Sequence, residues 1–278
     1  MRRIFLLFVL MIILYYVSKS VGVREYFPRG AKFSLLLPYL EPKIPLDEKR
    51  LFMVVLVNSA ASSVKHRLLR TAIRDTWGQI SSTRVPPNRI WKLFFVLGVS
   101  ESVENHAANL QEASHHNDII IGNFTDHYYN LAIKTFMGHY WAVSRFSCKY
   151  VLKTDDDVYV RVPNVIRWLK EERSPRPFYG GLVEKVSLRV AREPTSKWYV
   201  TKEQYAKDRW PSFCHGAFHI LSTDVIPIML KSARHKAPPH TDDAYIAVIM
   251  NHASVSATQI PGFAILYITT DCDLNTIN

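Results

Sequence analysis

The strongest constraint on the fold is a regular alternation between short apolar runs and segments with helical character. Apolar runs rich in β-branched and aromatic residues predict strands at 51–57, 91–97, 118–124 and 150–160. Between them, the predicted helices are 63–77, 101–116 and 130–146. Strands separated by helices predict an α/β fold with a mostly parallel central sheet flanked by helices, in which ligands bind at the carboxyl ends of the strands.

The composition is that of a folded protein with a basic surface. The chain has 278 residues, of which 48% are hydrophobic, and this excludes a disordered or collagen-like chain. A formal net charge of +11 would suit nucleic acid, an anionic membrane surface or a phosphate-bearing substrate. Because the basic residues form no clustered tract, we expect no nucleic-acid partner.

The N-terminus combines a basic flank with an apolar run. Arg2 and Arg3 precede an unbroken apolar stretch at 4–17, which is typical of a signal peptide or of a membrane anchor. The run ends in bulky residues such as Tyr15 and has no A-x-A cleavage site. We therefore favour an uncleaved signal-anchor helix over 4–23 that extends past Lys19.

An anchor of this kind would divide the chain between two compartments. The basic flank predicts that residues 1–3 are cytoplasmic and that everything after the anchor is lumenal. Residues 24–50 contain several prolines and mixed charges, and we interpret them as a stem. The lumenal folded domain is then predicted to span 51–278.

The cysteines and one sequon add weaker signals. Cys148, Cys214 and Cys272 lack the paired short spacing of a zinc site, and an oxidising lumen would allow any one of three disulfide pairings. The sequence does not choose among these pairings. Asn123 satisfies the N-x-[ST] pattern and is a candidate for N-glycosylation.

The sharpest chemical signal is a run of three carboxylates. Asp155, Asp156 and Asp157 follow the apolar start of a predicted strand. Adjacent like charges repel one another, and a cation or a network of hydrogen-bond donors stabilises them. A Mn²⁺ or Mg²⁺ ion held by one or two carboxylates, together with water and diphosphate oxygens, fits this arrangement. The alternative is a solvated acidic turn.

A second acidic element lies near the end of the predicted domain. Asp242 and Asp243 begin a segment of helical character, and Thr241 is positioned to cap it. Acidic residues in a first turn can simply complement the helix dipole. Alternatively, a carboxylate that projects into a cleft can act as a general base toward a hydroxyl group.

The order of several segments is more specific than any one of them. These segments are RTAIRDTWG at 70–78, the apolar residues 94–98, DHYYNLAIKT at 126–135, KTDDDVYV at 153–160, FYGG at 178–181, KWYV at 197–200, WPSFCHGAFHILS at 210–222 and the acidic pair at 242–243. In this order they resemble the β1,3-galactosyltransferase-like family, the inverting Golgi hexosyltransferases of glycosyltransferase family 31. The resemblance covers roughly residues 51–250 and implies a GT-A-like fold that binds a UDP-sugar.

The resemblance also implies roles for the acidic residues. Asp157 would bind Mn²⁺ or Mg²⁺, Asp155 would help to hold the metal and the nucleotide-sugar, and Asp156 would lie on the sugar-donor side. Asp243 matches the proposed catalytic base, and Asp242 stands beside it where many members have Glu. The remaining implied contacts to the sugar donor are Arg70, Arg74, Asn130 and Lys134. Trp77 and Trp198 are interpreted as packing residues as readily as ligands.

Three positions depart from the family pattern. Residues 214–218 replace a more glycine-rich stretch, and Ala132 replaces a usual Thr. The family commonly supplies a His metal ligand well beyond the acidic pair. Here His252 is too close along the chain, and the tail offers Asp271 and Asp273 instead.

These observations favour a single-pass type II Golgi membrane enzyme that transfers galactose or an N-acetylhexosamine from a UDP-sugar to a glycan on glycoprotein or glycolipid, with a β1,3 linkage. The alternative is a catalytically silent lumenal relative that binds or escorts glycoproteins. The altered glycines and the missing His favour that alternative, and the intact run of aspartates opposes it. The sequence leaves the transferred sugar and the acceptor open.

Overall fold

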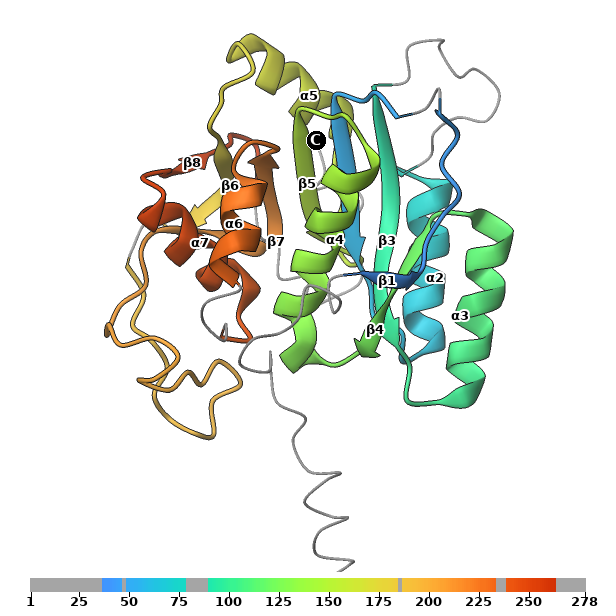
Figure 1. The fold of residues 1–278 in the computed structure, drawn as a ribbon, viewed down its shortest axis with the longest axis horizontal. Coiled ribbons are helices and arrows are strands. Elements are labelled where there is room, and N and C mark those ends of the chain that lie inside the picture. Colours follow the sequence, from blue (N-terminus) through green and yellow to red (C-terminus); the bar gives the residue numbers. More distant parts are fainter. Residues whose placement is uncertain (1–36, 47–48, 79–89, 185–186, 234–238, 264–278) are drawn as a thin grey trace, which may run out of the picture.

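The structure, a computed structural model, describes residues 37–46, 49–78, 90–184, 187–233 and 239–263. Within them, one eight-stranded mixed sheet has the order β1-β4-β3-β2-β5-β7-β6-β8, with helices packed around it (Figure 1). The strands are β1 (Pro38–Leu40), β2 (Met53–Asn58), β3 (Trp91–Val99), β4 (Ile119–Thr125), β5 (Tyr150–Asp155), β6 (Tyr179–Glu184), β7 (Phe213–Ser222) and β8 (Ala257–Gln259). The helices are α2 (Val64–Asp75), α3 (Val103–His116), α4 (Leu131–Arg145), α5 (Val162–Glu171), α6 (Ile226–Ala233) and α7 (Asp242–His252), with a 3-10 turn η3 (Tyr128–Asn130).

The α/β prediction is confirmed by the parallel half of the sheet. Strands β4, β3, β2 and β5 are parallel neighbours, and all six residues of β2 are buried. The first three predicted strands and all three predicted helices match observed elements to within two residues at each end. Because parallel strands need crossover connections, the alternation of periods specified this half of the fold.

The structure differs from the sequence analysis beyond Asp155. The strand predicted at 150–160 ends at Asp155, and a turn leads to α5, which begins at Val162. Strand β7 runs antiparallel to both β5 and β6, so the sheet is mixed, and four of its seven strand pairings are parallel. Asp155 is the last residue of β5, and Asp156 and Asp157 lie in the turn that follows it.

Each face of the sheet has its own hydrophobic core. In β2, Val54 and Leu56 face one core, and Met53, Val55 and Val57 face the other, as the period of two for strand side chains requires. Helices α4, α6 and α7 contribute to the first core, and α2, α3 and α5 contribute to the second. The layers are therefore helix, sheet and helix (Figure 1).

Part of the predicted stem belongs to the folded unit. Strand β1 pairs antiparallel with β4, and Glu41 accepts hydrogen bonds from Trp141 and Arg145 on α4. The predicted cytoplasmic residues 1–3 and anchor 4–23 lie outside the described residues. Among those that are described, no helix has the length and apolar character to cross a bilayer.

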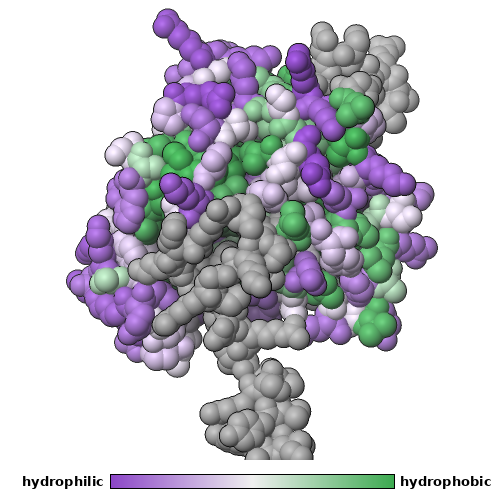
Figure 2. Space-filling model, viewed as in Figure 1, coloured by the Kyte–Doolittle hydropathy of each residue, from purple (hydrophilic) through white to green (hydrophobic). Residues whose placement is uncertain are grey.

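Some large hydrophobic side chains are exposed on the surface. On the face drawn in Figure 2, hydrophilic residues form most of the outline and hydrophobic ones lie between them. Leu68 on α2, Val103 at the start of α3 and Tyr159 after β5 are examples of exposed apolar residues. Apolar atoms contribute much of the surface of any folded protein, so single exposed residues of this kind need no functional explanation.

The packing of α4 against α7 generates a stability prediction. Phe136 on α4 is fully buried, and its ring stacks on Tyr245 of α7 with centroids 5.5 Å apart. Phe136→Ala should lower the free energy of unfolding by about 3–5 kcal/mol, because it removes buried apolar contacts and leaves a cavity. Leu68→Ala, at a helical side chain that is 64% exposed, should change it by less than about 0.5 kcal/mol. Urea denaturation measures both, and equal effects would contradict the assigned core.

Candidate active site

Two acidic elements that are far apart in the sequence meet at one edge of the sheet. Strands β2 and β5 are parallel, and Asn58 pairs in register with Asp155, so their carboxyl ends lie side by side. Helix α7 begins at Asp242. The Lys153 Nζ atom lies 2.7 Å from Asp155 Oδ1 and 3.7 Å from Asp242 Oδ2. The acidic run after β5 and the acidic pair of α7 therefore form one cluster.

Lys153 is the buried cation of this cluster. Its side chain is fully buried within β5, and Nζ donates hydrogen bonds to Asp155 Oδ1 at 2.7 Å and to the Gly216 carbonyl at 2.5 Å. Burial alone would lower the pKa of the Lys153 ammonium, but the charges of Asp155 and Asp242 outweigh it and raise that pKa. Lys153 is therefore charged, and it partly neutralises both acidic elements.

The three consecutive aspartates have three different environments. Asp155 is half-buried, Asp156 is buried and Asp157 is exposed. Asp156 Oδ2 accepts a hydrogen bond from Ser59 Oγ at 2.6 Å and lies 2.8 Å from His66 Nδ1. Burial raises the pKa of Asp155 against the lowering effect of Lys153, and the charge of Asp157 adds to the increase. Asp156 thus contacts α2, whereas the pKa of Asp155 is raised in part by the charge of Asp157.

The donor set at Asp155 and Asp157 suits a hard divalent cation. Both residues supply carboxylate oxygens, the ligands that Mn²⁺ and Mg²⁺ prefer. Within the described part of the chain, no group of three or more His, Cys, Asp and Glu side chains is arranged to hold a metal. A site that uses two carboxylates needs no third protein ligand when diphosphate oxygens and water complete the coordination. These residues therefore fit a metal that binds together with a nucleotide.

Asp242 and Asp243 are adjacent in sequence but differ in accessibility. Asp242 is 2% exposed, and its Oδ2 accepts a hydrogen bond from Thr135 Oγ1 at 2.7 Å. Asp243 is half-buried, and its oxygens accept hydrogen bonds from the Gly216 and Ala244 amides at 3.1 and 2.7 Å. Burial and the neighbouring Asp242 charge raise the pKa of Asp243 to about 6. An accessible carboxylate with this pKa can act as a general base near neutral pH.

Gly216 connects Lys153 to the candidate base. Its carbonyl accepts from Lys153, and its amide donates to Asp243 Oδ2. A Cβ atom at this position would lie 3.2 Å from Asp243 Oδ2. Glycine thus permits the close approach of β7 to the carboxylate, although the surrounding stretch departs from the glycine-rich family pattern.

Two buried histidines lie behind Lys153. His139 on α4 and His219 on β7 are fully buried, and their rings stack with centroids 5.6 Å apart. Burial lowers the pKa of His139 to about 4 and that of His219 well below its usual value. Both imidazoles are therefore neutral and add no positive charge beside Lys153.

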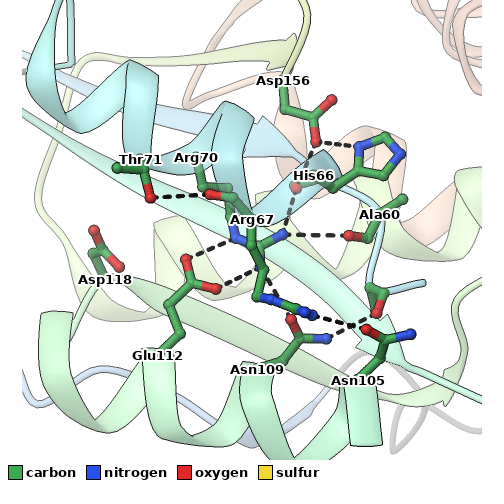
Figure 3. Close-up of polar contacts among 12 residues, drawn as sticks. Ala60, His66, Arg67, Arg70, Thr71, Asn105, Asn109, Glu112, Asp118 and Asp156 are labelled. Atoms are coloured by element: carbon green, nitrogen blue, oxygen red, sulfur yellow. Dashed lines mark hydrogen bonds and ion pairs between the residues drawn. The ribbon is translucent and has the colours of Figure 1, made fainter. Parts of the chain in front are cut away.

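The two arginines that were predicted to contact the sugar donor form ion pairs with carboxylates, and Figure 3 shows those of Arg70 between α2 and α3. Arg70 is fully buried and binds Glu112 at 2.9 and 2.5 Å and Ser59 Oγ at 2.8 Å. Arg74 binds Glu112 at 2.8 Å and Asp118 at 2.7 and 2.9 Å. Arg70 thus positions Ser59, which donates to the middle aspartate of the acidic run. Direct contact of either arginine with a sugar donor stays a prediction.

Lys134 and Asn130 also contact protein groups. Lys134 is 4% exposed, and its Nζ donates to the Ser59 carbonyl and to Asp126 Oδ1, both at 2.9 Å. Asn130 Nδ2 donates to the Thr125 carbonyl at 2.8 Å. Both residues stabilise the loops at the carboxyl ends of β2 and β4, and their predicted contact with the sugar donor is untested.

Several remaining predictions concern residues away from this cluster. Asn123 is exposed on β4, and its glycosylation stays a prediction. Cys148 and Cys214 are free thiols in the described residues, and Cys272 lies outside them together with Asp271 and Asp273.

Helix α7 separates His252 from the acidic pair. His252 is exposed at the C-terminal end of the helix that Asp242 begins. Eleven residues of α-helix place the two ends roughly 15 Å apart. His252 therefore does not lie near the carboxylates. Thr241 occupies the N-cap position of α7, but its side chain makes no capping hydrogen bond.

Sequence analysis assigned no role to Lys153, Ser59, His66 or Thr135. A lysine inside the apolar strand segment 150–155 is a signal in itself, because a buried ammonium requires anionic partners. The other three residues had no comparable signal. Their partners lie on other elements. The pairing of β2 with β5 brings Ser59 and His66 to Asp156, and the packing of α4 against α7 brings Thr135 to Asp242.

The shared ammonium generates a second stability prediction. Lys153→Met should lower the free energy of unfolding by about 3–5 kcal/mol, because Asp155 and Asp242 lose their buried counter-charge. Adding Asp242→Asn should restore part of that loss. The matched control is Lys202→Met, which removes an exposed ion pair with Asp208 and should cost less than about 1 kcal/mol. Urea unfolding of the single and double variants would contradict this network if the two substitutions were additive.

Comparison with known proteins places this arrangement in a family. A family model described as galactosyltransferase matches residues 69–261. Human beta-1,3-galactosyltransferase 5 is 34% identical over 212 residues, a match that covers 75% of this chain and 66% of that protein. The mouse protein of the same name is 38% identical over 186 residues, a match that covers 66% of this chain and 58% of that protein. The chain thus spans less than two thirds of the length of these two relatives.

Among solved structures, mouse xyloside xylosyltransferase 1 aligns with a TM-score of 0.36 at 8% identity, covering 76% of this chain and 85% of that one. The family match spans more than half of the chain and includes both acidic elements, with strand β5 and helix α7. The chain therefore belongs to the galactosyltransferase family, which confirms the resemblance of its ordered motifs.

Proposed function

We propose that this chain transfers a hexose, galactose or an N-acetylhexosamine, from a UDP-sugar to a sugar hydroxyl of a glycan, forming a β1,3 linkage. One observation carries the proposal. Asp243, a half-buried carboxylate with a raised pKa, belongs to the same Lys153-linked cluster as Asp155. A proton acceptor and a site for a nucleotide diphosphate must be adjacent for such a transfer.

The chain's own residues supply the general base and the backbone amides that orient it. Asp243 takes the proton from the acceptor hydroxyl as that oxygen attacks the anomeric carbon. The bond from the anomeric carbon to the diphosphate oxygen breaks, UDP leaves, and the configuration inverts. The amides of Gly216 and Ala244 hold the carboxylate of Asp243 through its two oxygens.

Charge on the leaving group must also be balanced. A Mn²⁺ or Mg²⁺ ion, held by Asp155 and Asp157, would supply Lewis-acid neutralisation of the diphosphate. Lys153 holds the Asp155 carboxylate in place. Asp242 is occupied by Thr135 and Lys153, and its buried charge tunes Asp243 and does not accept the proton itself.

The proposal includes a cellular setting. The basic flank and apolar run at 4–23 support a single-pass type II anchor with the folded domain in the lumen, and the family resemblance favours the Golgi membrane. The expected partners there are a UDP-sugar and a glycan acceptor on glycoprotein or glycolipid.

A panel of UDP-sugars, assayed for transfer and hydrolysis with and without Mn²⁺, tests the proposal. Wild-type protein should turn over one sugar donor in a metal-dependent manner. Asp243→Asn should bind UDP normally and lose transfer, because it lacks the base. Asp157→Ala should lose UDP-dependent Mn²⁺ binding and transfer together.

Each outcome of this panel decides a specific point. Normal turnover by Asp243→Asn would contradict the assignment of the base. A folded wild-type protein that neither turns over nor binds any UDP-sugar would contradict the enzyme and favour the silent relative.

The raised pKa of Asp243 predicts the pH dependence of the rate. Only the ionised carboxylate accepts a proton, so kcat/KM should fall as the pH drops below about 6. Asp242→Asn should move this acid limb to lower pH, because the negative charge of Asp242 contributes to the raised pKa. The pH profile of sugar transfer measures both effects. An acid limb that Asp242→Asn leaves unmoved would argue against the coupling.

A further inference from the structure

Two large aromatic side chains are exposed beside the candidate base. Trp198 is 56% exposed and lies in the loop between β6 and β7, and Tyr128 is 41% exposed in the turn η3. The two rings are neighbours, because the Lys197 ammonium lies over both of them. An indole with this exposure contributes little to a core, so the interpretation of Trp198 as a packing residue is not supported.

The pair is held next to the start of α7. The ring of His240 contacts the ring of Tyr128 with centroids 5.7 Å apart, and His240 Nε2 hydrogen-bonds to the Lys197 carbonyl at 2.7 Å. His240 precedes Asp243 by only three residues. Burial raises the pKa of Tyr128, and the charges of Asp243 and Asp242 raise it further. The phenol is therefore close enough to the acidic pair to interact with it electrostatically.

Contacts within the protein hold the Trp198 and Tyr128 rings in place before any ligand binds. The ammonium of Lys197 lies 4.6 Å from the Trp198 ring centroid and 5.8 Å from that of Tyr128. Val200, two residues after Trp198, is fully buried in the core and anchors the loop. A preordered aromatic surface lowers the entropy lost when a ligand binds to it.

We infer that Trp198 and Tyr128 form the acceptor subsite, where the terminal pyranose of the acceptor glycan stacks its apolar C–H face on the two rings. This inference deepens the proposed function and rests on it. A pyranose carries hydroxyl groups around its edge and apolar C–H groups on its face, so an aromatic surface binds the face and leaves the edge to polar groups. Seated here, the sugar presents a hydroxyl toward Asp243.

The position of the subsite separates it from the sugar-donor side. The carboxyl ends of β2 and β5, with Ser59, Asp156 and Asp155, form one side of the acidic cluster. Trp198 and Tyr128 lie with His240, on the side where α7 begins. An acceptor on one side and a UDP-sugar on the other would place Asp243 between them.

Kinetics on the intact domain test the inference. Acceptor KM is measured with the methyl β-glycosides of galactose, N-acetylglucosamine and N-acetylgalactosamine, at a saturating concentration of the sugar donor that the wild type uses. Trp198→Ala should raise acceptor KM about tenfold, the loss expected for one aromatic stacking contact. Trp198→Tyr should restore much of the affinity. UDP affinity and hydrolysis of the sugar donor without acceptor should remain at wild-type values in both variants.

The control is Tyr39→Ala, which removes a ring that is 47% exposed on the edge strand β1 and should leave acceptor KM unchanged. Equal acceptor KM in Trp198→Ala and wild type, or an equal increase in the KM of the sugar donor, would overturn the subsite and leave the proposed function intact. A wild-type protein that neither transfers a sugar from any UDP-sugar nor hydrolyses one would overturn the proposed function, and the subsite with it.

Discussion

One buried ammonium determines the geometry of the site. Lys153 is enclosed in a central strand and shared among Asp155, Asp242 and the carbonyl of Gly216. Removing such a charge from water is costly, and only close anionic partners with good geometry offset that cost. Because these partners come from β5, α7 and β7, the requirement to surround Lys153 fixes three elements relative to one another. The site follows from the same constraint.

Different burial gives chemically identical side chains different roles. Asp242 is enclosed by Thr135 and Lys153, whereas Asp243 is half-buried and held by backbone amides. The charge of Asp242 contributes to the raised pKa of Asp243, and Asp243, the more accessible of the two, is suited to exchange a proton with a substrate. In the acidic run, Asp156 likewise turns inward to Ser59 and His66. The flanking aspartates remain available for a cation.

The sequence predicted the parallel half of the fold well because its signal is local. Strands such as β2 are buried on both faces and are therefore continuously apolar, and the helices between them show their own period. Strand β7 was not predicted. It contains Cys214, His215, Gly216 and His219, whose polarity and small size obscure the pattern of a buried strand. The strand end at Asp155 was also missed, because Val158, Tyr159 and Val160 continue the apolar and β-branched composition beyond it.

The candidate site was predictable as a set of residue types but not as a set of contacts. The acidic run and the acidic pair were identified from the sequence, and the fold brings them together as the family resemblance implies. The ion pairs of Arg70 and Arg74 could not be predicted, because their shared partner Glu112 lies on another helix. Trp198 was ambiguous because exposure is a tertiary property. Burial and partner choice depend on packing between distant segments, which local patterns do not encode.

The central claim is that a nucleotide-bound metal at the acidic run and the base Asp243 share one site. Paramagnetic broadening by Mn²⁺ with UDP tests it most directly, using the ¹³C-carboxyl signal of Asp243, which is identified by its loss in Asp243→Asn. We predict that this signal broadens strongly in the wild type and stays sharp in Asp157→Ala. A sharp Asp243 signal in wild-type protein saturated with Mn²⁺ and UDP would contradict the account.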